Sequence, residues 1–394
     1  MKFADGVFPL ALLWLPLASC LSAEDHPLGL RQEKPATGRY VEVDTGCMVP
    51  YSLKIPGTEV VFSMEPIPGG SYLIGSAPDE PERRPDEGPQ VELSLEPFWI
   101  GKYEVTWAEY KKFMGLYAVF KDFQSKNQRR VTDSNLADAV TAPTELYDPS
   151  FTFEFGEDPK LPAVTMTQYA AKQYTKWLSA ITGHQYRLPS EAEWECACRA
   201  GATTAYHFGN DPSQLDEYGW YYDNANEMPH QVGLKKPNPW GLHDMHGNVW
   251  EWVLDEYSEQ GYQRLSGRHL KGAEAVAWPT ILFPRVVRGG SWDDDSSACR
   301  SAAKLPSHDL DWKSEDPNLP LSPWWFTSDP SRGVGFRLIR SLREVPKAAM
   351  AKYWEADVED VRFDVESRLD EGRGALGLVD DKLPAAIRQL NESK

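Results

Sequence analysis

The chain has 394 residues, with 41 Lys and Arg against 59 Asp and Glu, and a formal net charge of −18. This acidity argues against nucleic-acid binding and against docking on anionic lipid, because both partners require clustered positive charge. Five Cys without a Cys-x-x-Cys pair argue against a disulfide scaffold and a zinc knuckle. The 41% of hydrophobic residues predicts a globular chain, and the 15 Trp, 31 Pro and 29 Gly indicate an irregular fold.

The N-terminus predicts an export signal over residues 1–23. Val7–Ala18 is apolar but, at twelve residues, is shorter than the stretch of about 20 that spans a bilayer. Leu17–Cys20 matches the bacterial lipoprotein pattern, in which the Cys is lipidated; ordinary cleavage near Ala23 is the alternative, and a buried native helix is a third. The first two predict export, either as a periplasmic or cell-surface lipoprotein anchored through Cys20 or as a secreted protein. No later segment predicts a transmembrane span.

Residues 24–59 form an N-terminal extension, and residues 60–343 read as one continuous domain without a linker. Strand signals come first, in Tyr72–Gly75 and in the alternation of Val91–Leu95. Capping boxes, in which a hydroxyl and a carboxyl or amide three residues later satisfy backbone N–H groups, then mark helix starts. They are Thr106 with Glu109, Thr165 with Gln168, and Ser190 with Glu193.

The second of these helices is expected to bury an apolar face and to end at Gly183. Residues 115–160 show weak periodicity and predict a long loop or insertion. Strand and helix signals alternate without βαβ regularity, which predicts an α+β fold. Residues 344–394 form an acidic helical tail, in which a stripe runs from Val358 to Leu369. The stripe indicates either a helix packed on the domain or a helix that binds a partner.

In their order along the chain, seven motifs resemble the formylglycine-generating enzyme, or sulfatase-modifying factor, family. The resemblance covers about residues 60–340 and implies an irregular α+β domain, C-type-lectin-like and low in regular secondary structure. The motifs are Ile67–Ser71, Tyr103–Thr106, Tyr186–Glu195, Pro237–Leu242, His246–Trp252, Arg288–Trp292 and Gly335–Arg337.

The founding activity of this family is the oxidation of a sulfatase Cys to formylglycine with O₂ and copper. The resemblance implies two Cys, five residues apart, after the Gly-Gly-Ser turn; here Cys299 takes the second place and Asp294 takes the first. A carboxylate is a poor replacement for thiolate on Cu(I), so the copper site is expected to be incomplete. Ser291 matches the family's active-site serine. Plainer interpretations are a turn residue for Ser291 and a small buried hydrophobe for Cys299.

The resemblance also implies a structural calcium site in the loop before and within the His246–Trp252 motif. Its ligands would be the side chains of Asp244 and Glu251 and the main-chain carbonyls of Gly247 and Val249. Calcium prefers several hard oxygen ligands, which two carboxylates and turn carbonyls supply. A metal-free loop held by hydrogen bonds is the alternative.

Three functions follow from these observations, and whether the protein is an enzyme stays open. The first is an exported, non-oxidising or altered family member that acts as a binding or scaffold module for a protein or peptide, with a sulfatase as one candidate. The second is an active formylglycine-generating oxidase, in which Cys299 and Ser291 would be catalytic and copper the cofactor. The third is a C-type-lectin-like binder of carbohydrate or protein.

Overall fold

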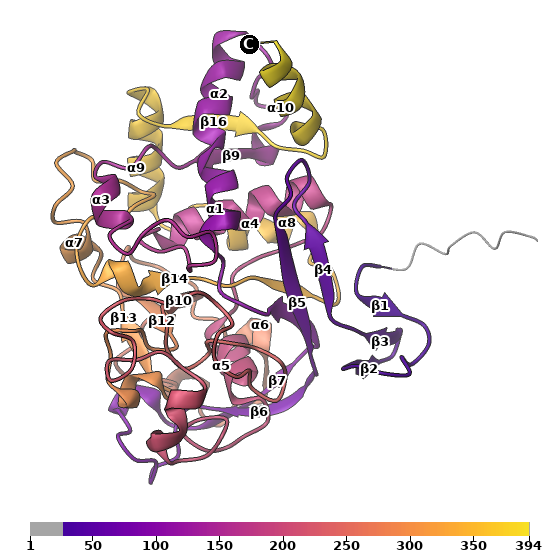
Figure 1. Cartoon of the computed structure of the whole chain (residues 1–394), viewed down its shortest axis with the longest axis vertical. Helices are drawn as coiled ribbons and strands as arrows, with labels where there is room; N and C mark the ends of the chain where they lie inside the picture. Colours follow the sequence, from indigo (N-terminus) through magenta and orange to yellow (C-terminus); the bar gives the residue numbers. More distant parts are fainter. Residues whose placement is uncertain (1–26, 394) are drawn as a thin grey trace, which may run out of the picture.

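The computed structural model describes residues 27–393, in which short strands form several small sheets between irregular segments (Figure 1). The predicted export signal, with its lipoprotein pattern and Cys20, lies outside the described residues. Two sheets have four strands each, in the orders β15 (Ile339–Ser341), β8 (Phe98–Gly101), β5 (Val61–Ile67), β4 (Tyr51–Lys54) and β13 (Lys304–Pro306), β12 (Arg285–Arg288), β10 (Trp250–Glu256), β14 (Val334–Gly335). Two sheets have three strands each, in the orders β1 (Leu30–Arg31), β3 (Gly46–Met48), β2 (Val41–Val43) and β11 (Leu270–Lys271), β7 (Val91–Leu95), β6 (Gly70–Ile74). The last sheet pairs β16 (Ala375–Leu378) with β9 (Ala139–Ala142).

The helices are interspersed with these strands instead of alternating with them in βαβ units. Among the described strands only the pairs β10 with β14 and β11 with β7 are parallel, and the remaining pairs are antiparallel. The predicted α+β class is confirmed. The helices are α1 (Trp107–Met114), α2 (Leu116–Ser125), α3 (Pro149–Thr152), α4 (Gln168–Thr182), α5 (Glu191–Arg199), α6 (Gly272–Ala275), α7 (Asp309–Trp312), α8 (Lys347–Trp354), α9 (Glu359–Asp370) and α10 (Leu383–Glu392).

Two of the three predicted helix starts are confirmed. Thr106 and Ser190 cap α1 and α5, and each forms a complete capping box. The third prediction is wrong by two residues: Thr167 caps α4, and its hydroxyl accepts the Ala170 N–H at 3.1 Å. Thr165 has a φ of +68°, outside the extended conformation of an N-cap residue.

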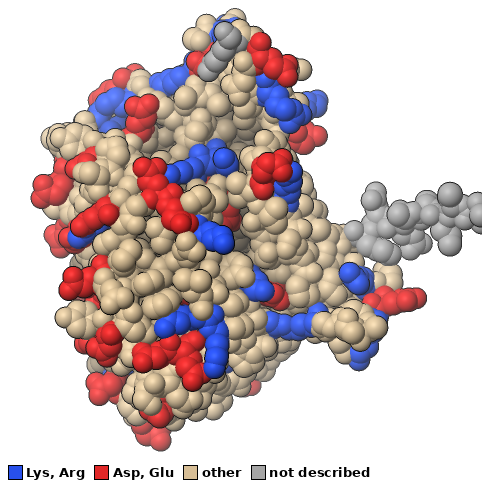
Figure 2. All heavy atoms as spheres, in the orientation of Figure 1, with Lys and Arg blue, Asp and Glu red and all other residues tan. Residues whose placement is uncertain are grey.

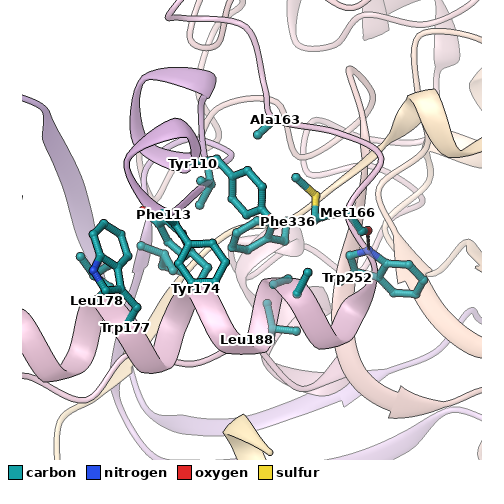
Figure 3. Close-up of a cluster of buried hydrophobic side chains, with 14 of the residues drawn as sticks. Tyr110, Phe113, Ala163, Met166, Tyr174, Trp177, Leu178, Leu188, Trp252 and Phe336 are labelled. Atoms are coloured by element: carbon teal, nitrogen blue, oxygen red, sulfur yellow. Dashed lines mark hydrogen bonds between the residues drawn. The ribbon is translucent and has the colours of Figure 1, made fainter. Parts of the chain in front are cut away.

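The core forms around α4, whose predicted apolar face is buried as expected. Tyr174, Trp177 and Leu178 point from this helix toward Tyr110 and Phe113 of α1 (Figure 3). Tyr174 stacks on Tyr110, with 5.7 Å between ring centroids. Large aromatic side chains therefore make up much of the core between α1 and α4.

The long loop predicted for residues 115–160 is wrong in part, because α2, β9 and α3 lie within it. The partner that stabilises α2 and β9 comes from the tail, since β16 pairs with β9 and packs against α2. A Cβ on Gly377 of β16 would lie 2.2 Å from the Phe120 ring, so the close approach of β16 to α2 requires glycine. The hydrophobic periodicity of residues 115–160 did not reveal α2 and β9, because contacts with a distant segment stabilise them.

The tail packs on the body of the molecule, as the packed-helix interpretation of its stripe expects. Val358, Val361 and Val365 are buried, and Asp357 joins Lys172 of α4 and Arg285 of β12. Strand β16 was not predicted. Within residues 27–393, none of the helices has the length and apolarity that a bilayer crossing requires.

Candidate functional site

A tight turn after β12 brings the predicted site residues Ser291 and Cys299 together. Gly289 and Gly290 have φ values of +108° and +78°, which side-chain-bearing residues rarely adopt. A Cβ on Gly290 would lie 2.5 Å from the Cys299 Sγ. The glycines therefore let the turn close over the short 3₁₀ segment Ser296–Cys299 that carries this thiol.

Asp294, which stands at the position of the family's first Cys, closes this turn with hydrogen bonds. Its Oδ2 accepts the Ser291 N–H at 3.0 Å, the Ser291 hydroxyl, and the Trp250 indole N–H at 2.7 Å. Burial raises the pKa of Asp294, and the three donors oppose that rise. The carboxylate thus acts as a structural acceptor that ties the turn to β10.

Cys299 is fully buried in a small cluster with Tyr206, Leu215 and Tyr221. Burial raises the pKa of its thiol well above the usual value, and the negative charge of Asp294 adds to the rise. A thiol that stays protonated is a poor nucleophile. This environment fits the plainer interpretation of Cys299, a small buried hydrophobe.

Two histidines that the sequence analysis did not assign lie beside this cluster. His246 donates Nδ1–H to the Cys299 carbonyl at 2.7 Å, and its Nε2 lies 2.9 Å from Nδ1 of His207. Burial lowers the pKa of His246 to about 3 and that of His207 to about 4, so both rings are neutral near pH 7. His246 lies within a recognised motif, but nothing in the sequence pairs it with His207.

A second thiol, that of Cys198, also lies beside His246. Its Sγ lies 3.7 Å from the His246 ring nitrogens, and burial raises the pKa of Cys198 to about 12. All four cysteines of residues 27–393 are free and buried. The donors around Cys299 therefore do not fit a Cu(I) site of two thiolates, because Cys299 is the one sulfur at the two family positions and the carboxylate at the other position is held in the turn.

The predicted calcium ligands Asp244 and Glu251 lie in a second cluster with Glu104 and Arg337. Glu251 is fully buried, and Arg337 holds both of its oxygens at 2.6 Å. Asp244 accepts the Gly233 N–H at 2.7 Å through Oδ2, while its Oδ1 is buried without a hydrogen-bond partner. Glu104 accepts the Asn248 amide at 2.8 Å, so it faces the same loop.

When ionised, these three carboxyls outnumber the cations that act on them, Arg337 and the partly exposed Lys235, which leaves surplus negative charge in a buried site. Burial, then the charges of Asp244 and Glu251, raise the pKa of Glu104 well above its usual value. Burial likewise raises the pKa of Asp244 to about 6. In the part of the chain that the structure describes, no group of three or more His, Cys, Asp or Glu is already arranged to hold a metal ion. The unpartnered Asp244 oxygen and the surplus charge nevertheless fit a divalent cation there.

Comparison with known proteins identifies the family of this chain. Residues 56–313 match the family model of the sulfatase-modifying factor enzyme 1-like domain. A mouse (Mus musculus) protein named inactive C-alpha-formylglycine-generating enzyme 2 is 29% identical to this chain over 66% of the chain and 93% of its own length. A serine/threonine-protein kinase pkn1 of Chlamydia caviae is 30% identical over 66% of this chain, which spans only 36% of that protein's length. The structure of PvdO from Pseudomonas aeruginosa superposes with a TM-score of 0.51 and 26% identity, covering 74% of this chain and all of PvdO.

Proposed function

The chain belongs to the sulfatase-modifying factor enzyme 1-like family, and from this premise we propose that it is an exported, non-oxidising member that acts as a binding or scaffold module. The observation that carries the proposal is Asp294, a hard ligand at the first-Cys position whose Oδ2 is engaged by Ser291 and Trp250. Its partner would be a protein or peptide, and a sulfatase is the class that the family suggests.

The state of Cys299 supports the same function. The resemblance implies two thiolates for Cu(I), whereas Cys299 is the one Cys at the two positions and is fully buried. The mouse relative named inactive shows that the family includes a protein described as lacking the activity. A lectin-like role receives less support, because every Trp within residues 27–393 is buried or only partly exposed, which limits stacking on a sugar ring.

Copper titration tests the proposal. We expect the purified protein to bind no stoichiometric Cu(I) and to leave the Cys of a sulfatase peptide unmodified. The variant Asp294→Cys, which supplies the second sulfur, should bind Cu(I) more tightly than the natural sequence, and Cys299→Ser in that background should remove the gain. Copper-dependent conversion of the peptide Cys by the natural sequence would show that the protein is an oxidase.

We also propose that the Asp244 cluster binds calcium through the side chains of Asp244 and Glu251 and the carbonyls of Gly247 and Val249. The unpartnered Asp244 Oδ1 and the surplus charge support this site. The ion would have to share Glu251 with Arg337, which holds both carboxylate oxygens.

Thermal unfolding with and without calcium tests the calcium site. We expect saturating calcium to raise the Tm of the natural sequence, since a ligand that binds only the folded state stabilises it. Asp244→Asn should lose this rise, whereas Asp79→Asn, which changes an exposed carboxyl elsewhere, should keep it. A Tm that is independent of calcium in all three proteins would show that the cluster binds no calcium.

A further inference from the structure

A groove of about 280 Å³ lies between the junction of α1 and α2, helix α4 and helix α10. The turn between β4 and β5, residues 56–58, closes one side of it. Figure 1 shows α10 beside α2 at the top of the molecule. Neither Cys299 nor Asp244 lines the groove, so it is separate from both clusters described above.

The floor of the groove is open at Gly115, which joins α1 to α2 with helical dihedral angles, φ −60° and ψ −16°. A Cβ at this position would meet the carbonyl oxygens of Lys111 and Lys112, at 3.5 Å and 3.7 Å, which are ordinary contact distances. Neither the backbone conformation nor the packing therefore requires glycine, although glycine destabilises a helix relative to alanine. What Gly115 provides is free space above the helix.

Aliphatic side chains form the accessible walls of the groove. Val119 of α2 faces it from one side, and Pro384 and Ile387 of α10 line it as well; all three are partly exposed, so a ligand can contact them. Trp177 and Leu383 also line the groove but are buried, so they support the walls and offer little contact area. These walls favour an alkyl chain, because covering it here removes apolar surface from water.

The charged side chains of the groove are all cationic. Lys112 and Arg388 are exposed, and neither forms an ion pair with any residue in 27–393. Lys111, by contrast, is paired with Glu157 at 2.6 Å. Figure 2 shows Lys and Arg side chains near α10; acidic side chains also occur there, but among the described residues no Asp or Glu lines the groove.

The charge and the size of the groove together define its ligand. Two unpaired cations beside one groove stand out in a chain with a formal net charge of −18, and they attract an anion. Because aliphatic walls lie next to these cations, the anion should carry an alkyl chain. The volume is close to the lower end of the range of small-molecule pockets, about 300–1,000 Å³, and so suits a single unbranched chain.

From this arrangement we infer that the groove binds an unbranched alkyl carboxylate, that is, a fatty acid of medium chain length. The alkyl chain lies over Gly115 and packs on Val119 and Ile387, and the carboxylate lies near Lys112 and Arg388. The inference goes beyond the binding role proposed above, and it depends neither on copper nor on calcium nor on a protein partner.

Calorimetric titration of the full chain with octanoate, acetate and octylammonium tests the two parts of the ligand. We expect octanoate to bind at least about a hundredfold more tightly than acetate, because each buried CH₂ group tightens binding about fourfold. Octanoate should also bind about tenfold more tightly than octylammonium, which has the same chain length and the opposite charge. In methyl nuclear magnetic resonance spectra, octanoate should shift the signals of Val119 and Ile387.

Two outcomes of these titrations would overturn the proposal. Equal binding of octanoate and octylammonium would show that the cations do not select the ligand. Tighter binding of Nα-acetyl-leucyl-leucine than of octanoate would assign the groove to the carboxyl end of a peptide instead of a fatty acid.

Matched variants assign the binding to the two unpaired cations. Lys112→Gln with Arg388→Gln should weaken binding of octanoate about tenfold and remove its advantage over octylammonium. Lys160→Gln with Arg268→Gln, the same charge change at two exposed positions outside the groove, should leave it unchanged. Equal losses in the two double variants would show that net charge, and not this groove, determines binding.

Gly115→Ala provides a test that does not alter charge. Alanine favours the helix, so we expect a higher Tm for the ligand-free protein, while the added methyl group fills the floor and should weaken binding of octanoate at least about fivefold. Ser125→Ala, which favours the same helix outside the groove, should leave binding unchanged. A higher Tm of Gly115→Ala with unchanged binding would place octanoate elsewhere and overturn the proposal. The copper and calcium titrations do not depend on this groove, so the proposals fail separately.

Discussion

Arg337 and Glu251 form a fully buried ion pair with two hydrogen bonds, one from Nε and one from Nη2, each 2.6 Å long. Arg337 belongs to the last motif of the family domain and Glu251 to β10, so the pair joins segments far apart in sequence. Glu104 and Asp244 lie close enough for their charges to raise the pKa of Arg337, against the lowering effect of its burial. One guanidinium therefore balances much of the negative charge in this part of the core.

Replacing Arg337 should destabilise the fold strongly. Arg337→Met leaves the Glu251 carboxylate buried without a counter-charge, and we expect a loss of about 3–5 kcal/mol in the free energy of unfolding. Urea unfolding followed by tryptophan fluorescence measures it. The control is Arg362→Met, which removes an exposed pair with Glu359 and should change stability by less than about 1 kcal/mol. Equal losses in the two variants would contradict this account of the cluster.

Asp294 should matter for stability even though it replaces a metal ligand. Asp294→Ala removes the acceptor for Ser291 and Trp250, and we expect a loss of about 2–3 kcal/mol in the free energy of unfolding. The exposed neighbour Asp293 gives the comparison, because Asp293→Ala should change stability by no more than about 0.5 kcal/mol. Chemical denaturation of both variants would settle whether the carboxylate supports the turn.

The two confirmed capping boxes should respond to pH in opposite directions. Burial raises the pKa of Glu109 to about 7, since no cation faces it. An unfolded glutamate titrates near about 4.3, so Glu109 lowers stability progressively as pH rises from there to about 7. We expect Glu109→Gln to gain stability relative to the natural sequence over this range, as measured by urea unfolding at pH 4.5 and 7.5.

Glu193 is the matched control for that pH series. Burial acts to raise the pKa of Glu193, but the paired Arg187 guanidinium holds this pKa below its usual value. Its contribution is present above about pH 4.3 and is lost as pH falls further. Glu193→Gln should therefore lose stability near pH 7 and lose less in acid. The same sign of change in both variants would contradict the assignment of these charges.

The tail should be part of the folded unit. Burial acts to raise the pKa of Asp357, but two cations hold this pKa well below its usual range. They are Arg285, whose Nη2 lies 2.7 Å from the Asp357 carboxylate, and Lys172, whose Nζ lies 3.0 Å from it. Asp357→Ala leaves two buried cations without their carboxylate, and we expect a loss of about 3 kcal/mol in the free energy of unfolding. Asp360→Ala, at an exposed position three residues on, should stay within about 0.5 kcal/mol. A small change for Asp357 would indicate that the tail is only loosely attached.

The helix starts and the apolar face of α4 could be predicted because both depend on residues close together in the sequence. The boxes at Thr106 and Ser190 were predicted because cap and partner lie three residues apart, and the apolar face of α4 was predicted because its repeat is helical. The prediction that Thr165 caps α4 was wrong because this residue has a positive φ, which an N-cap residue does not adopt. Thr167 is the N-cap residue instead. A threonine two residues away offers the same chemistry, so composition alone does not choose between them.

The parts that could not be predicted depend on contacts between distant segments. Strand β9 and helix α2 depend on β16 of the tail, a partner that no local window contains. The motifs placed Ser291, Asp294 and Cys299 near one turn, but the hydrogen bonds of Asp294 and the pairing of His246 with His207 emerge only in three dimensions. Likewise, Asp244 and Glu251 were expected as calcium ligands, whereas the capture of Glu251 by Arg337 was not.

The pairing of β9 with β16 also sets an order of events during folding. Ala139–Ala142 cannot complete its ladder until Ala375–Leu378 has emerged from the ribosome, so the apolar side of α2 stays uncovered for most of synthesis. Contacts between such distant segments slow folding, because a long loop must close before they form.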